Sequence, residues 1–226
     1  MKKSSFFKYF LLLFAVPAAV ALGAIIFRGK AYIFVSVCVA VFACVPFLLS
    51  FEKGRTRTKN LVVLATMVTL SIVGRFAFAF LPHFKPVTAI VVITGIYLGA
   101  ENGFLCGALS ALISNFIFGQ GPWTPFQMLA WGLIGFFAAV LANTLKKSRF
   151  ALSIYGAFSG ALYSLLLDVF ATLWHDGVFN PARYLALMLT ALPVTAVYAA
   201  SNIIFLLLLA KPIGEKLERI KTKYGL

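Results

Sequence analysis

Long apolar runs alternate with short polar segments along the whole chain. About 20 apolar residues suffice for a helix to cross a bilayer, and proline and glycine mark most of the breaks between the runs. Eight helices are therefore expected, at residues 9–27, 31–51, 60–81, 87–100, 103–118, 125–145, 150–174 and 181–210. The pattern predicts an all-α integral membrane protein.

A basic segment, EKGRTRTKN, divides the predicted helices into two groups. We expect residues 1–59 to hold two N-terminal helices and a basic linker, residues 60–213 to form a six-helix core, and residues 214–226 to be a basic tail. A cleaved signal peptide is the alternative for the first helix, because Ala-Val-Ala near position 20 resembles a cleavage site. The apolar run continues past that point, which favours a helix.

Composition agrees with a membrane protein, since 62% of the residues are hydrophobic and the mean hydropathy is +0.99. With both termini inside, fifteen of the twenty Lys and Arg residues lie on the inner side, four lie outside, and Arg75 lies within a helix. This distribution follows the positive-inside rule and predicts a cytoplasmic N- and C-terminus. The net charge of +14 is thus explained by topology, and nucleic acid is not expected as a partner. Cys38, Cys44 and Cys106 lie in apolar runs without metal-type spacing.

The segment from Phe118 to Trp131 is the most distinctive polar break, and it lies on the outer side in this topology. Thr124 is expected to cap a helix, with Pro125 in its first turn and Gln127 as the capping-box partner. Thr124, Gln127 and Trp131 share one helix face by their spacing. The alternative is a tight turn followed by tryptophans of the interfacial belt.

Two ionisable residues, Arg75 and Asp168, lie inside predicted helices at similar distances from the outer end. Charges within a membrane are costly, so they usually pair, face a cavity or act in function. A structural ion pair, an arginine that snorkels to the membrane surface and a role at a ligand cavity are all consistent with the sequence. Asn115, near the outer end of its helix, either points into the same space or joins helices.

Motifs for enzyme chemistry are absent from the sequence, which contains no GxxxxGK[ST], HExxH or GxSxG. His83 and His175 fall in predicted outer loops and are expected to be solvated polar residues, so no metal site is predicted. Glycines at positions 95, 99, 103 and 107 recur every four residues, which favours close helix packing, either within the chain or against a partner.

The run VGRFAFAFLPHFKPVTAIVVITGIYLGAENGFLCGALSALISNFIFGQGPWTPFQMLAWGLIGF resembles the substrate-binding S component of energy-coupling factor (ECF) vitamin transporters. The resemblance covers about residues 60–210. Gly74-Arg75, Pro82 to Pro86 and Gly119 to Gln127 look most like S components assigned to cobalamin or related corrinoids. Riboflavin or pantothenate is the alternative ligand, and a lipid-modifying enzyme or a purely structural subunit is the alternative class.

The resemblance implies a bacterial cell-membrane receptor that captures a vitamin at its outer side. It implies separate partners, an energising transmembrane subunit and two cytoplasmic ATPases, and no resident cofactor, since a bound corrinoid would be transported substrate. The expected ligand chamber consists of Arg75, Pro82, His83, Phe84, Lys85, Asn115, Gln120, Trp123, Thr124, Gln127, Trp131 and Asp168. The expected docking surface consists of Ala65, Thr69, Gly95, Gly99, Gly103 and Gly107. In the family this surface carries Ala-xxx-Ala, where the chain has Ala65-xxx-Thr69.

Overall fold

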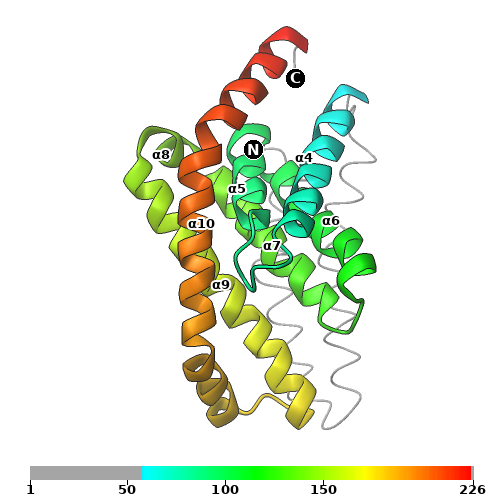
Figure 1. Ribbon diagram of the computed structural model, residues 1–226, viewed down its shortest axis with the longest axis vertical. Helices are drawn as coiled ribbons and strands as arrows, with labels where there is room; N and C mark the ends of the chain where they lie inside the picture. The colour runs from blue at the N-terminus through cyan, green and yellow to red at the C-terminus, as the bar shows by residue number, and fades with distance from the viewer. Residues whose placement is uncertain (1–57, 225–226) are drawn as a thin grey trace, which may run out of the picture.

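The computed structural model describes residues 58–224, and these form only α-helices and their connections (Figure 1). The helices are α4 (Thr58–Ala77), α5 (Val87–Leu98), α6 (Ala100–Phe118), α7 (Thr124–Val140), α8 (Ala142–Lys147), α9 (Arg149–Asp176) and α10 (Pro181–Tyr224). Four of them, α4, α6, α9 and α10, are long and apolar enough to cross a membrane. The predicted all-α membrane class is confirmed for this part of the chain. The two helices expected before residue 58, with Cys38 and Cys44, lie outside the described residues.

The short helix α5 is the centre of the fold, and it packs against every other described helix. Its sequence is apolar on all sides, which is typical of a helix buried within a bundle. Ala89, Val91, Val92 and Ile93 of α5 are fully buried. In Figure 1, α5 lies between α10 and α4. Helices α6 and α7 pack closely against each other, and so do α9 and α10.

Three basic regions that the sequence assigns to one side of the membrane lie toward one end of the bundle. The start of α4, the short helix α8 and the C-terminal end of α10 all point to the top of Figure 1. Near this end Lys146 forms an ion pair with Glu218 at 3.0 Å, which joins α8 to α10. The loops at residues 119–123 and 177–180 lie toward the opposite end.

The helix boundaries differ from the predicted ones where local backbone chemistry intervenes. Helix α4 ends at Ala77 rather than Leu81, because residues 78–81 form hydrogen-bonded turns, including Leu81 N–H to Phe78 O at 3.1 Å. Helix α10 continues to Tyr224, well beyond position 210, and includes the segment expected to be a tail. Its 44 residues span about 66 Å at 1.5 Å per residue. Two prolines, Pro193 and Pro212, lie inside α10, and the helix changes direction near both ends in Figure 1.

The expected cap of α7 is wrong in its details. Trp123 is the N-cap residue, and its side chain makes no capping hydrogen bond. The Thr124 hydroxyl instead donates to Gln120 Oε1 at 3.0 Å and accepts from Asn115 Nδ2 at 2.9 Å. Asn180 does cap α10, since its side-chain oxygen accepts from the backbone N–H groups of Ala182 and Arg183.

Most of the glycine series packs inside the chain rather than on a docking surface. A Cβ atom placed on Gly95 would lie 2.1 Å from the Gly135 carbonyl oxygen, and one on Gly103 would lie 2.5 Å from the same atom. A Cβ atom on Gly107 would meet the Trp131 backbone at 2.4 Å. These glycines let α5 and α6 approach α7. Gly99 differs from the other three glycines. Its φ of +94° interrupts the helical conformation between α5 and α6, and no atom lies within 4 Å of a Cβ placed on it.

Candidate functional site

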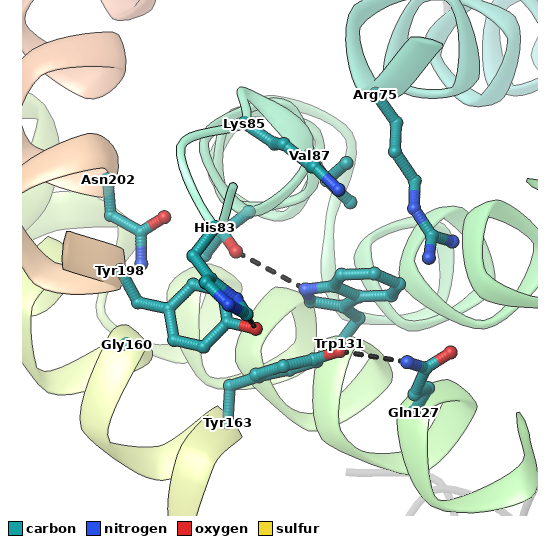
Figure 2. A pocket seen from close by; sticks show the side chains of 11 residues that line it. Arg75, His83, Lys85, Val87, Gln127, Trp131, Gly160, Tyr163, Tyr198 and Asn202 are labelled. Carbon is teal, nitrogen blue, oxygen red and sulfur yellow. Dashed lines mark hydrogen bonds between the residues drawn. The ribbon is translucent and has the colours of Figure 1, made fainter. Parts of the chain in front are cut away.

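A cavity of about 220 Å³ lies among α4, α5, α7, α9 and α10, next to the loop at residues 78–86 (Figure 2). Its lining combines aromatic rings, amides, hydroxyl groups and two cationic side chains. The lining residues are Arg75, His83, Lys85, Val87, Thr88, Gln127, Trp131, Gly160, Tyr163, Tyr198 and Asn202. Aromatic surface combined with convergent polar groups is typical of a small-molecule binding site, and the polar share of this lining is high.

One wall of the cavity is aromatic. Trp131 and Tyr163 stack with ring centroids 5.0 Å apart and an interplanar angle of 25°. Tyr198 meets Tyr163 edge to face at 5.2 Å, and the His83 ring meets Tyr198 edge to face at 5.3 Å. Trp131 Nε1 donates to the Thr88 hydroxyl at 3.3 Å, which fixes the indole plane. Figure 2 shows these rings grouped around the cavity. The wall offers a rigid apolar surface to a flat ligand.

Behind this wall, a buried hydrogen-bond network links four helices. Arg75 Nη1 donates to the Ser114 hydroxyl and, at 2.9 Å, to Asn115 Oδ1. Asn115 Nδ2 in turn donates to Gln127 Oε1 at 2.8 Å, and Gln127 Nε2 donates to the Tyr163 hydroxyl at 3.1 Å. The network therefore runs from α4 through α6 and α7 to α9. Because each buried amide has partners on both sides, the cavity is pre-organised.

The two cationic residues of the lining share one aromatic neighbour. The Arg75 guanidinium carbon lies 4.6 Å from the centroid of the Phe118 ring, and Lys85 Nζ lies 5.3 Å from it. Arg75 is also 5.4 Å from the Trp131 ring and is 9% exposed. Partial burial lowers the pKa of Lys85, and the nearby charge of Arg75 lowers it further. The cavity thus contains concentrated positive charge.

The loop that carries His83 and Lys85 is tied to α10. The Lys85 backbone N–H donates to the Ser201 hydroxyl at 2.9 Å, and that hydroxyl donates to the Lys85 carbonyl at 3.2 Å. His83 Nδ1 lies 3.1 Å from the Tyr198 hydroxyl, and His83 has a positive φ of 62°. The loop is therefore held in a defined position over the cavity.

The structure brings together five of the predicted chamber residues, namely Arg75, His83, Lys85, Gln127 and Trp131. Asn115 and Thr124 lie behind the lining, where both belong to the hydrogen-bond network. The remaining five do not line the cavity: Pro82, Phe84, Gln120, Trp123 and Asp168. Whether any of the twelve contacts a ligand stays a prediction.

Three of the residues outside the lining have contacts elsewhere that explain their positions. Phe84 packs against Phe205 at 5.2 Å between ring centroids, in the apolar core. Gln120 donates to the Leu112 carbonyl at 2.9 Å and accepts from Thr124. Trp123 is 38% exposed, and its ring lies close to Gly121. These contacts stabilise the loops rather than the cavity.

Arg75 and Asp168 do not form the ion pair that their matching depth suggested. The Arg75 guanidinium binds Ser114 and Asn115 of α6 instead. Asp168 Oδ2 is buried without a hydrogen-bond partner among the described residues. Depth fixes the height of a residue in the membrane, but the packing of each helix decides which way its side chain points.

Sequence reasoning missed the lining residues that lie within the apolar runs. These are Val87, Thr88, Gly160, Tyr163, Tyr198 and Asn202. Tyr163 and Tyr198 could have been identified from the sequence, because the hydroxyl of a tyrosine within a spanning helix needs a hydrogen-bond partner. So could Asn202, whose amide donates to the Gly156 carbonyl at 3.1 Å.

The remaining docking residues, Ala65 and Thr69, lie on the exposed face of α4. This placement leaves them accessible to a partner helix, and their docking role stays a prediction. Within residues 58–224, no group of three or more His, Cys, Asp or Glu side chains is placed to hold a metal ion.

The comparisons with known proteins point to one family. The family model described as "ECF-type riboflavin transporter, S component" matches residues 55–219. This range includes every residue that lines the cavity. No curated protein and no solved structure matches the chain.

Proposed function

The chain belongs to the family of ECF-type riboflavin transporter S components, and from this premise we propose that it captures a vitamin with a flat ring system for uptake by an ECF importer. The observation that carries the proposal is the cavity with its aromatic wall, which the buried amide network supports from behind. Trp131 and Tyr163 supply ring surface, while Gln127 and Asn202 supply hydrogen-bonding groups. This combination suits a ligand with a planar heterocycle.

Riboflavin is the first candidate ligand. The family description names it, and the small cavity favours the more compact of the two candidate ring systems. At about 220 Å³, the cavity lies just below the range of about 300–1,000 Å³ that is usual for drug-sized ligands. A small outward movement of the loop at residues 78–86 would enlarge it.

A corrinoid is the second candidate, and the sequence resemblance at Gly74-Arg75, Pro82 to Pro86 and Gly119 to Gln127 favours it. Corrinoids are several times larger than riboflavin. Binding a corrinoid would require the loops at residues 78–86 and 119–123 to move outward and the cavity to widen between α7 and α10. The proposal therefore predicts a larger conformational change for a corrinoid than for a flavin.

Active uptake needs partners in this account. An S component has no ATPase motif of its own, so we propose that an energising transmembrane subunit and two ATPases drive the transport step. The chain then acts as the specificity subunit. Its exposed face at Ala65 and Thr69 of α4 is the proposed contact with the energising subunit.

The test is a calorimetric titration of the purified chain in detergent with riboflavin, cobalamin and pantothenate. We expect one of them to bind stoichiometrically, without being converted, and Gln127→Ala to weaken that binding. Trp174→Ala is the matched control, because Trp174 is 50% exposed and outside the cavity. Conversion of an added phospholipid would support the enzyme alternative. Absence of binding by all three vitamins would contradict the proposal.

A further inference from the structure

We propose that the ligand of this cavity carries an anionic group, most simply a phosphate, that pairs with Arg75 and Lys85. The inference rests on the proposed function of vitamin capture and specifies which chemical class of vitamin the site prefers. For a flavin, the inference favours riboflavin 5′-phosphate over riboflavin itself, and for a corrinoid it favours the phosphate-bearing cobalamin.

The first observation is an imbalance of charge. Arg75 and Lys85 both line the cavity, and no Asp or Glu is among the lining residues. The described ion pairs join Lys146 to Glu218, Arg183 to Asp176 and Lys211 to Glu215, so none of them neutralises these two cations. A buried charge without a counter-ion is costly in a protein. An anionic ligand would remove that cost.

The second observation is the geometry of the guanidinium. Both of its side-chain hydrogen bonds leave from Nη1, toward Ser114 and Asn115. Nε is buried and has no hydrogen-bond partner among the described residues. In Figure 2 the guanidinium reaches from α4 toward the cavity and lies near Trp131. The guanidinium at the cavity therefore has a hydrogen-bond donor that no described residue satisfies.

The third observation places the two cations on the same side of the cavity. Arg75 and Lys85 both lie over the Phe118 ring, at 4.6 and 5.3 Å from its centroid. A planar guanidinium with a nearby ammonium group is a common arrangement for binding phosphate oxygens. The Trp131 ring lies beside the same guanidinium, so a ring attached to a phosphate would meet aromatic and cationic groups together.

Two pairs of ligands test the inference, because the members of each pair differ in phosphate. Riboflavin is compared with riboflavin 5′-phosphate, and cobinamide, which lacks the phosphate-bearing nucleotide loop, is compared with cobalamin. The dissociation constants are measured by calorimetry on the full chain in detergent. We expect the phosphate-bearing member of the preferred pair to bind at least tenfold more tightly.

Variants separate charge from shape. Arg75→Gln is expected to abolish the preference for phosphate, whereas Arg75→Lys, which keeps the positive charge, is expected to retain part of it. Lys85→Met is expected to reduce the preference. Arg183→Gln is the matched control, because Arg183 pairs with Asp176 outside the cavity and should leave the preference unchanged.

The outcomes distinguish this inference from the proposed function. Equal or tighter binding of the phosphate-free member by the wild-type chain would overturn the anionic preference and leave vitamin capture intact. Failure of all four ligands to bind would overturn the inference, and failure of pantothenate as well would overturn vitamin capture. A phosphate preference that survives in a folded Arg75→Gln, Lys85→Met double variant would overturn the assignment to these two residues.

Discussion

Asn115 of α6 donates a hydrogen bond from Nδ2 to Oε1 of Gln127 on α7 at 2.8 Å. Asn115 also accepts from Arg75, and Gln127 also donates to Tyr163. This single amide contact therefore connects the cationic side of the cavity to its aromatic wall. Asn115 is 1% exposed, so no bulk water can replace a lost partner.

Removing this amide should destabilise the fold. Asn115→Ala would leave Arg75 without its Oδ1 acceptor and Gln127 without its donor. We expect a loss of about 1–3 kcal/mol, the usual cost of leaving buried polar groups unsatisfied. The measurement is thermal unfolding in detergent, with Asn143→Ala as the control at an exposed position. An unchanged midpoint for Asn115→Ala would mean that the network contributes nothing to stability.

The glycines predict a contrast between packing and backbone strain. A Cβ atom on Gly103 would lie 2.5 Å from the Gly135 oxygen and 2.7 Å from Gly95 Cα, so Gly103→Ala must separate α6 from its neighbours. Gly99→Ala meets no atom within 4 Å and only places alanine at φ +94° and ψ 173°, a region that glycine alone readily adopts, at a cost of about 1–3 kcal/mol. We expect Gly103→Ala to reduce thermal stability more than Gly99→Ala does. The reverse order would contradict the close packing of α5, α6 and α7.

Substitutions on the exposed face of α4 should disrupt assembly with the energising subunit without affecting vitamin binding. Leucine at both Ala65 and Thr69 would enlarge a surface that contacts no buried core. We expect vitamin binding to be retained and co-purification with the energising subunit to be lost. Phe150→Leu on α9 is the control, because Phe150 is 76% exposed on a different helix. Normal co-purification of the double leucine variant would exclude this face as the docking surface.

The sequence identified the fold class and about half of the cavity lining, and the particular residues explain why. Five lining residues stand out from the apolar sequence around them, because they lie in or beside polar breaks or are charged within an apolar run. These are Arg75, His83, Lys85, Gln127 and Trp131. Thr88, Tyr163, Tyr198 and Asn202 lie within apolar runs. Their inward direction depends on how α5, α9 and α10 rotate against their neighbours, which no local pattern records.

Tertiary contacts also override local rules at the start of α7. Thr124 and Gln127 have the spacing of a capping box. Asn115 of α6 occupies both of their oxygens instead, at 2.9 and 2.8 Å. The same limit applies to Asp168, whose depth matches that of Arg75 but whose side chain does not meet it.

The claim that the vitamin binds in the cavity is tested most directly by comparing the effects of Trp131→Ala and Trp123→Ala on vitamin affinity. Trp131 is 6% exposed and lines the cavity, whereas Trp123 is 38% exposed and does not. The dissociation constant of the bound vitamin is measured calorimetrically for wild type, Trp131→Ala and Trp123→Ala, with circular dichroism to confirm folding. The account predicts at least tenfold weaker binding for Trp131→Ala, about 1.4 kcal/mol, and a change of less than about twofold for Trp123→Ala, as is usual for residues outside a binding hot spot. Wild-type affinity in a folded Trp131→Ala variant, or a large loss only in Trp123→Ala, would contradict it.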